Sequence, residues 1–332
     1  MSDDLPPFFG HLVGAFSVLL LQLGRQSGLL ETVLAGGGTA REIAGRADVD
    51  VRNADEWLRG MTVAGYLSED DGVFAPTPTT SVTFSADFPV SVTSVLDGLW
   101  AAPQVYEDVV SAIRSGAGIS SDRLAPYAPF VGVNTPTYRT ALVAEWFASV
   151  PGLTDRLAAG ARVAEIAPGN GAAAAIVGTA FPASTVVGYD LEPKGGVDLP
   201  PNTTLRAVDA RGLPDEGPFD LVYCLDSLHH MGDAVGVLAG IRRVLAPGGT
   251  VLVAETDLTG DLARDAEDPS AVIAYTSSVV YCLQEALGAG GEVHSCAEGT
   301  RWVEDAMAAA GFSDVRVHHS ETGYAVLTGV AV

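Results

Sequence analysis

The chain has 332 residues, of which 48% are hydrophobic, and it carries a formal net charge of −23. This length is enough for two domains with large cores, and the hydrophobic content excludes a disordered chain. The strong negative charge disfavours polyanionic partners, so we expect no binding to DNA or RNA.

The first 85 residues predict a small helical domain. Residues 10–34 predict a long buried helix followed by a shorter one, and Thr39 with Glu42 forms a capping box, which predicts a third helix. The apolar run at 17–23 is too short to cross a bilayer, and no signal peptide precedes it. We therefore expect a cytoplasmic protein with no membrane partner.

A fourth helix and a hairpin complete this domain. Residues 50–67 predict the helix, with Asp50 or Asn53 as its cap, and Asp71-Gly72 predicts a hairpin between two short strands. Three helices and a hairpin are typical of a winged helix-turn-helix. Residues 1–80 hold 5 arginines and 11 acids, a balance of −6, so we favour a domain for dimerisation and substrate covering over one for DNA binding.

Residues 86–150 predict a helical linker that covers the substrate, interrupted by an irregular segment over 118–136. Aromatic side chains gather in its second half, and most such clusters are core packing. Some of them would line a substrate pocket if the site lies at a domain junction. They are Tyr127, Phe130, Tyr138, Trp146 and Phe147.

Strands and helices alternate over the predicted third domain, residues 151–332. This pattern predicts an α/β fold with a Rossmann-like, doubly wound and mostly parallel sheet. The last two strands form a hairpin, so the C-terminal strand is expected to be antiparallel. The predicted strands cover 162–167, 185–190, 204–208, 219–224, 250–255, 314–319 and 323–330.

A glycine turn follows the first of these strands, in the stretch RVAEIAPGNGAAAAIVG at 162–178. Gly169, Gly171 and Ala174 leave room for a tight turn, for the approach of a ligand and for close packing of the next helix. Asp190 ends the second strand, where a carboxylate can accept both hydroxyls of a ribose. These features together predict a nucleoside cofactor.

The chain resembles the class I S-adenosylmethionine-dependent methyltransferases over about residues 160–332. The resemblance is carried by Glu165 with APGNG, by Asp190, by the pair Asp209-Ala210, by FDLVYCLDSLHHM at 219–231 and by RRVLAPGGTVLVAE at 242–255. With the acidic N-terminal domain, the whole chain is similar to the branch with a winged-helix dimerisation domain, in particular to bacterial enzymes of small molecules. The resemblance implies a homodimer, a small secondary metabolite as substrate, and S-adenosylhomocysteine as the product of the cofactor.

The resemblance also implies which residues hold the cofactor. The amino-acid part of the cofactor is expected at Glu165 and the glycine turn, and its ribose at Asp190. Its adenine is expected after the third predicted strand and its methionine portion after the fourth. Residues that match these places are Glu165, Ala167, Gly169, Asn170, Gly171, Asp190, Leu191, Asp209, Ala210, Leu225 and Asp226.

Ala167 and Pro168 depart from the family, which has a glycine at the first position and a small or polar residue at the second. Alanine disfavours a positive φ, and proline removes one N–H and favours an extended conformation for Ala167. A strand end tolerates that conformation. We therefore expect cofactor binding to be retained but altered.

His229 and His230 lie in the loop after the fourth strand, at the edge where the methyl group would point. An imidazole titrates near neutrality and suits the removal of a proton from an oxygen or nitrogen nucleophile. By its position in SLHHMGD, His229 resembles the general base of winged-helix O-methyltransferases. His230 stands where those enzymes have an aspartate, so the match is partial.

Three other functions fit part of the pattern. An enzyme that binds S-adenosylmethionine without transferring its methyl group, such as a cyclase, isomerase or lyase of natural-product biosynthesis, is the alternative. A nicotinamide dehydrogenase and a ligand-sensing transcription regulator are weaker fits. Cys224, Cys282 and Cys296 are widely spaced and lack the pairing of a zinc motif, so we expect no metal site.

Overall fold

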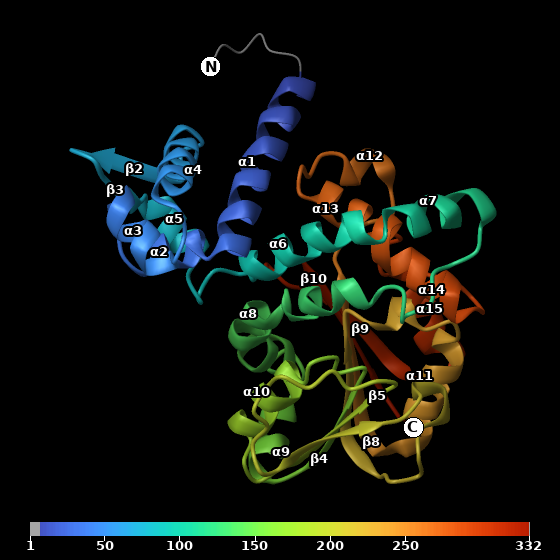
Figure 1. Ribbon diagram of the computed structural model, residues 1–332. Helices are drawn as coiled ribbons and strands as arrows, with labels where there is room; N and C mark the ends of the chain where they lie inside the picture. Colours follow the sequence, from blue (N-terminus) through green and yellow to red (C-terminus); the bar gives the residue numbers. More distant parts are fainter. Residues whose placement is uncertain (1–6, 332) are drawn as a thin grey trace. The chain divides into compact units, whose positions relative to one another are not determined.

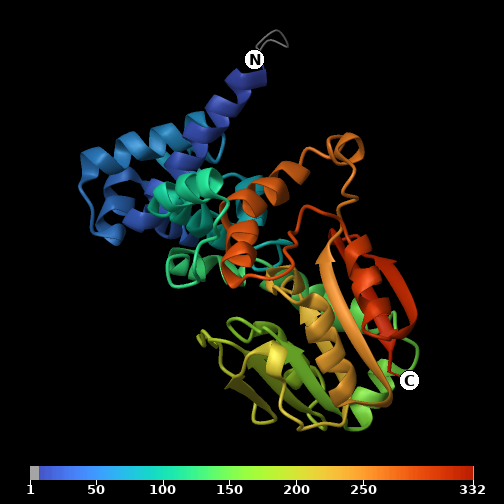
Figure 2. The same ribbon diagram turned by 90° about the vertical axis from the view of Figure 1, so that its right-hand side faces the viewer.

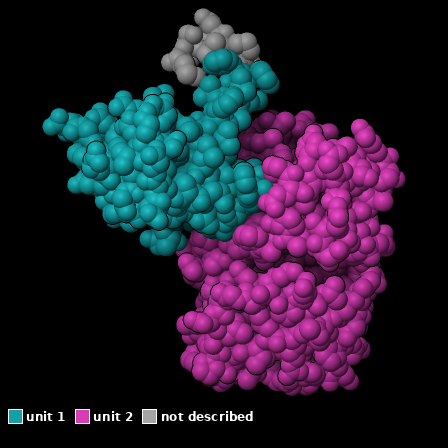
Figure 3. All heavy atoms as spheres, in the orientation of Figure 1, with its two compact units in different colours: residues 1–100 teal, residues 101–332 magenta. Residues whose placement is uncertain are grey.

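The computed structural model of the protein describes residues 7–331. They form two compact units, of which the N-terminal unit ends at Trp100 and the C-terminal unit begins at Ala101 (Figure 3). The finer division at residues 85 and 150 stays a prediction.

The N-terminal unit consists of helices around a small antiparallel sheet with the order β1-β3-β2 (Figure 1). Its helix starts follow from local caps: Thr39 and Glu42 form the predicted capping box, and the Asp50 side chain accepts from the backbone N–H of Asn53. The wing-like hairpin turns at Asp71-Gly72, both with positive φ. The elements are α1 (Pro7–Ser27), α2 (Leu29–Ala35), β1 (Gly38–Thr39), α3 (Ala40–Ala47), α4 (Val51–Val63), β2 (Leu67–Asp70), β3 (Val73–Pro76), α5 (Pro78–Thr83) and most of α6 (Val92–Ala101).

The prediction of a buried first helix is wrong, because α1 exposes most of its apolar side chains. Phe8 and Phe16 are 72% and 62% exposed. The helix is apolar on several sides, and within its unit it packs mainly on α2 and α4, so much of its surface has no partner. Residues 8–27 are also long and apolar enough to cross a membrane, which the short run at 17–23 did not suggest, but core helices pass the same test.

The C-terminal unit is built on a seven-stranded sheet with the order β6-β5-β4-β7-β8-β10-β9. Strands β4 to β8 are parallel, and β10 is antiparallel to both of its neighbours. The predicted fold class and all seven predicted strands are therefore confirmed. The strands are β4 (Arg162–Ile166), β5 (Thr185–Asp190), β6 (Thr203–Ala207), β7 (Phe219–Leu225), β8 (Leu245–Thr256), β9 (Ser313–His319) and β10 (Tyr324–Val330).

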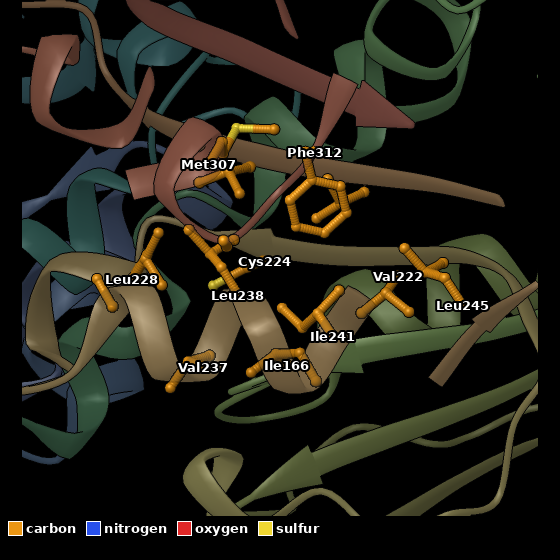
Figure 4. Packing of buried hydrophobic residues seen from close by; sticks show 14 of the residues in the cluster. Ile166, Val222, Cys224, Leu228, Val237, Leu238, Ile241, Leu245, Met307 and Phe312 are labelled. Carbon is orange, nitrogen blue, oxygen red and sulfur yellow. The ribbon is translucent and has the colours of Figure 1, made fainter. Parts of the chain in front are cut away.

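Helices cover both faces of this sheet. On one face, α11 (Ala234–Val244) and α15 (Arg301–Ala309) pack on alternate side chains of the strands, as Figure 4 shows for Leu238, Ile241 and Met307 around Val222 and Cys224. Figure 2 shows α11 lying along β8. The other face is covered by η3 (Tyr138–Phe147), α9 (Leu153–Ala159) and α10 (Ala172–Ala180).

Among the clustered aromatics, Trp146 and Phe147 are fully buried and pack against the sheet, so for these two the core interpretation is correct. Tyr127 belongs instead to a small separate core, in which its ring stacks on Tyr281. Further helical segments that build this part are α7 (Tyr106–Ser115), η2 (Ala125–Gly132), α8 (Thr135–Thr137), α12 (Leu262–Asp265), α13 (Ala271–Ser277), η6 (Ser278–Cys282) and α14 (Leu283–Ala289).

The contact between α1 and α4 depends on Gly24. A Cβ atom at Gly24 would lie 2.2 Å from the buried ring of Trp57, whose Nε1 donates to Leu20 O at 2.8 Å. We expect Gly24→Ala to lower the free energy of unfolding by about 1–3 kcal/mol, because the ring must move.

The matched control is Gly14→Ala in the same helix, where a Cβ atom would have no neighbour within 4 Å. There alanine should raise stability by about 0.5–1 kcal/mol through its helix propensity. Chemical denaturation of the three proteins measures both effects. Equal stability of the two variants would contradict the tight contact.

Candidate active site

Acidic side chains gather where the parallel strands end. Because neighbouring parallel strands end at one edge of a sheet, the carboxyl ends of β4, β5, β7 and β8 form a common edge. Glu165 lies near the end of β4, Asp190 ends β5, Asp226 follows β7, and Glu255 lies near the end of β8. The predicted site residues of these strands are thereby brought to one edge.

The turn after β4 keeps the backbone of a glycine turn although its first position is alanine. Ala167 has a φ of +55°, close to the +56° of Gly169. The expected extended conformation of Ala167 is therefore wrong. The Ala167 N–H donates to Tyr189 O at 2.8 Å, and this bond to the neighbouring strand holds the left-handed residue in place.

Pro168 fits because the adjacent strand has no side chain beneath it. A Cβ atom at Gly188 on β5 would lie 2.8 Å from Cγ of Pro168. The proline ring thus occupies the space that Gly188 leaves free. The Pro168 carbonyl accepts from the Gly171 N–H at 2.8 Å and so closes the turn.

Asp190 joins the turn to the second strand. Its Oδ2 accepts from the Gly169 N–H at 2.9 Å and its Oδ1 from the Glu192 N–H at 2.8 Å. Each carboxylate oxygen has a second lone pair, so both bonds are compatible with further donors. Asn170 accepts from the Ala172 N–H at 3.0 Å at the start of α10, whereas Leu191 is 69% exposed.

Glu165 is buried beneath the turn. The Tyr223 hydroxyl donates to its Oε2 at 3.0 Å. Burial raises the pKa of Glu165 to about 8, against the opposing effects of Tyr223 and the backbone N–H of Ala174. The carboxyl group is therefore mostly protonated at pH 7.

Asp209, the predicted adenine contact, is paired within its own turn. Both of its oxygens accept from the guanidinium of Arg211, at 2.6 Å for the shortest contact. Its pKa is lowered, chiefly by this hydrogen bonding to Arg211. Ala210 begins the short helix η4 (Ala210–Gly212) behind it.

His229 lies on the short helix η5 (Leu228–His230) and is 1% exposed. Its Nδ1 is 2.6 Å from Oε2 of Glu255, while Oε1 of Glu255 accepts from the backbone N–H groups of Leu228 and His229. Nε2 of His229 is buried and has no hydrogen-bond partner among the described residues. A carboxylate that fixes Nδ1 and leaves Nε2 free is the arrangement of a histidine general base.

Charge at this dyad favours the imidazolium form. Burial lowers the pKa of His229, but Glu255 and Asp226 outweigh it and raise the pKa to about 9. At neutral pH the imidazole is therefore largely protonated, and Nε2 can accept a proton only in the fraction of molecules that has lost it.

Asp226 follows Leu225 at the end of β7 and has a φ of +49°. It accepts from Asn134 Nδ2 at 2.9 Å and from the Tyr324 hydroxyl at 3.3 Å. Burial raises its pKa.

His230 also lies beside a carboxylate. Its Nδ1 is 2.8 Å from Oε2 of Glu285 on α14, but it makes no hydrogen bond among the described residues, and its ring centroid is 4.2 Å from that of His229. Each histidine of the motif therefore has a carboxylate neighbour, and only His229 is hydrogen-bonded to it.

Sequence reasoning missed both carboxylate partners and the side chains that hold Asp226. Glu255 could have been found as an acid near the end of the strand beside the histidine loop. Glu285 lies on α14 and Asn134 in the turn before α8, both far away in the sequence, and no local signal marks them.

Known proteins identify this domain. Residues 164–251 match the family described as methyltransferase domain. This segment is therefore a methyltransferase domain. A relative, the 27-O-demethylrifamycin SV methyltransferase of Amycolatopsis mediterranei (strain S699), is 32% identical over 148 residues, or 38% of this chain and 54% of that protein, so the chain spans about half the length of this relative.

Solved structures of low sequence identity share the fold of the whole chain. A putative O-methyltransferase of Nostoc punctiforme is 18% identical with a TM-score of 0.73 and covers 99% of this chain and 100% of its own. Human N-acetylserotonin methyltransferase, in complex with S-adenosylmethionine, is 16% identical with a TM-score of 0.69 and covers 99% of each chain.

The methyltransferase domain fits S-adenosylmethionine as its cofactor. The turn has no side chain at Gly169 and Gly171, where a Cβ atom would lie 2.6 Å from Val131 and 2.9 Å from Leu205. Carboxyl groups stand near it on β4 and β5, in Glu165 and Asp190. The hydroxyl groups and the ammonium group of such a ligand would donate to these carboxyl oxygens.

The strain at Ala167 can be tested by stability. A left-handed φ costs an alanine about 1–2 kcal/mol, and a glycine almost nothing. Ala167→Gly should therefore leave stability unchanged or raise it by up to about 1 kcal/mol, once the larger chain entropy of unfolded glycine is included. The control Ala173→Gly, within α10, should lower stability by about 1 kcal/mol or more. Similar losses in both variants, measured by denaturation, would show that Ala167 is unstrained.

The raised pKa of Glu165 predicts a pH-dependent stability. Between about pH 5 and 8 the folded protein keeps a proton that the unfolded chain releases, so the free energy of unfolding should fall as pH rises. Glu165→Gln removes this term and should flatten the slope by about 1 kcal/mol per pH unit. Exposed Glu321→Gln is the control. Parallel slopes for wild type and Glu165→Gln in denaturation series would exclude the protonated carboxyl.

Proposed function

We propose that the protein is an S-adenosylmethionine-dependent O-methyltransferase that acts on a hydroxyl group of a small natural product. The observation that carries the proposal is the pair of His229 and Glu255, with the buried Nε2 atom of His229 left without a partner. It lies next to the strand ends at which the methyltransferase domain would hold its cofactor.

The chemistry needs little more than positioning and one proton acceptor. When bound, S-adenosylmethionine supplies a methyl group on a good leaving group. Nε2 of His229 would take the proton that the acceptor oxygen loses on methylation. Glu255 keeps the imidazole oriented through Nδ1 and stabilises the imidazolium that results.

An oxygen acceptor is favoured over a carbon acceptor by this proton acceptor. The names of similar proteins also favour an oxygen acceptor. The Amycolatopsis relative is a methyltransferase of 27-O-demethylrifamycin SV. The Nostoc protein is described as a putative O-methyltransferase. The cofactor would be held by Glu165, the turn at Ala167–Gly171 and Asp190. The natural-product class of the substrate is part of the proposal and rests on the relative.

We also propose a homodimer that binds neither nucleic acid nor a membrane. The support is the apolar surface of α1 and the groove of about 580 Å³ between α1 and α4, which Phe9, Leu12, Phe16 and Val63 help to line. A groove of this kind is more typical of a protein contact than of a solvent-exposed surface. The net charge of −23 argues against polyanions.

Methyl-labelled cofactor tests the proposal directly. We expect label to pass from S-adenosylmethionine to a hydroxylated polyketide or phenol in an acceptor panel. His229→Gln should lower kcat by about 10²–10⁴-fold, because the proton acceptor is lost, while the Kd for S-adenosylhomocysteine stays within about threefold. Asp190→Ala should weaken S-adenosylhomocysteine binding measured by calorimetry.

The matched control is His319→Gln, since His319 also pairs with a carboxylate, Asp257 at 2.8 Å, but is exposed on the edge strand β9. Its activity should equal that of the wild type. Unchanged kcat in His229→Gln would refute the base. Cofactor binding without label transfer to any acceptor would favour the non-methylating alternative.

A further inference from the structure

Three potential metal ligands from distant segments converge in the C-terminal unit. One ligand atom each of His229, His230 and Cys282 lies within 4.8 Å of the others. Cys296 lies outside this group, but its Sγ is 3.8 Å from Sγ of Cys282. Both cysteines are buried, at 7% and 8% exposure.

The spacing of the two sulfur atoms suits a shared metal ion. Zinc binds thiolate sulfur at about 2.3 Å in a tetrahedral arrangement, which places two such sulfur atoms about 3.8 Å apart. A disulfide would require about 2.05 Å. The Cys296 thiol donates to Sγ of Cys282 at 3.8 Å, which is also the spacing of two thiolates on one zinc ion.

His229 is oriented in the way that metal-ligating histidines usually are, and His230 also has a carboxylate beside its ring. Metal-bound histidines nearly always place their second ring nitrogen on a carboxylate or carbonyl, which fixes the ring. Nδ1 of His229 is 2.6 Å from Glu255, and Nδ1 of His230 is 2.8 Å from Glu285. Nε2 of His229, buried and without a partner among the described residues, is the remaining ligand atom of that ring.

The chemistry of the set selects the ion. Two thiolates and two neutral imidazoles neutralise a divalent cation, and thiolate favours zinc over magnesium or calcium. We propose that His229, His230, Cys282 and Cys296 form a Zn²⁺ site. Binding would release the thiol protons, and the carboxylates of Glu255 and Glu285 would orient the rings.

The site has a consequence for the proposed function, although it does not depend on it. Zn²⁺ would occupy Nε2 of His229, the atom that the methyl transfer needs as proton acceptor. The metal-bound protein would then be inactive as a methyltransferase, and the metal-free protein active. Zinc would thus act as an inhibitor at the base.

Cobalt provides a spectroscopic test that does not use activity. Chelator-treated full-length protein is titrated with Co²⁺, and we expect one ion per chain, with tetrahedral d–d bands and a thiolate-to-cobalt charge-transfer band. Cys282→Ser and Cys296→Ser should each weaken that band at least twofold and lower the affinity at least tenfold. Cys224→Ala, which removes the cysteine on β7 outside this set, should change neither. Cobalt bound without a sulfur band would overturn the proposal.

Alkylation of the wild type keeps the test decisive if a serine variant does not fold. With Zn²⁺ present, Cys282 and Cys296 should react at least tenfold more slowly than in the chelator-treated protein, as mapped by mass spectrometry. Equal reaction rates would contradict the site. A 2 Da mass loss joining the two cysteine peptides, insensitive to Zn²⁺, would identify a disulfide pair instead.

Methyl transfer then separates the two proposals. Zn²⁺ should inhibit the chelator-treated wild type at the concentration at which it protects the cysteines, and Cys282→Ser should need at least tenfold more. Absence of methyl transfer by the metal-free protein would contradict the proposed function alone, because the cobalt spectrum and the alkylation result do not depend on it.

Discussion

The contact between Glu255 and His229 organises the candidate active site. Both side chains are almost fully buried, and Nδ1 of His229 lies 2.6 Å from Oε2 of Glu255, so each buried polar group has the other as its partner. Glu255 also accepts from the backbone of Leu228 and His229, and one carboxylate therefore fixes both the ring and the loop that carries it. The parallel pairing of β7 with β8 brings the two residues together, so the chemistry of the loop depends on the order of the strands.

The glycine turn shows a similar dependence on the neighbouring strand. Ala167 and Pro168 are poor residues for this turn when considered alone, since one disfavours the left-handed φ and the other removes a donor. On β5, however, Tyr189 accepts the Ala167 N–H and Gly188 leaves room for the proline ring. The left-handed backbone of the turn is thereby kept with unusual residues, and the conformational strain at Ala167 is offset by contacts with β5.

The features that the sequence predicts are those set by residues close together in the chain. Buried parallel strands are short apolar runs, and Thr39 or Asp50 marks a helix start within three residues, so these features were predictable. The exposure of α1 could not be predicted, because an apolar helix has the same sequence pattern whether its side chains pack in a core or lie at the surface. Nor could the φ of Ala167, since the rule for a residue before proline ignores the hydrogen bond to Tyr189. The contacts made by Glu255, Glu285 and Asn134 could not be predicted. They depend on the order of the strands and on segments distant in sequence that pack at the edge of the sheet, and the spacing of residues in the sequence does not show either.

The same limit applies to the proposed zinc site, which the spacing of the cysteines does not indicate. A zinc motif is recognised in sequence when its ligands come in closely spaced pairs. Here Cys282 ends η6 and Cys296 lies beyond α14, and the histidines come from the loop after β7, more than fifty residues earlier. A single lone pair, on Nε2 of His229, then has two possible acceptors, a substrate proton and a metal ion. Because the carboxylate on Nδ1 strengthens this lone pair for either one, a feature that makes His229 a better base also makes it a better ligand.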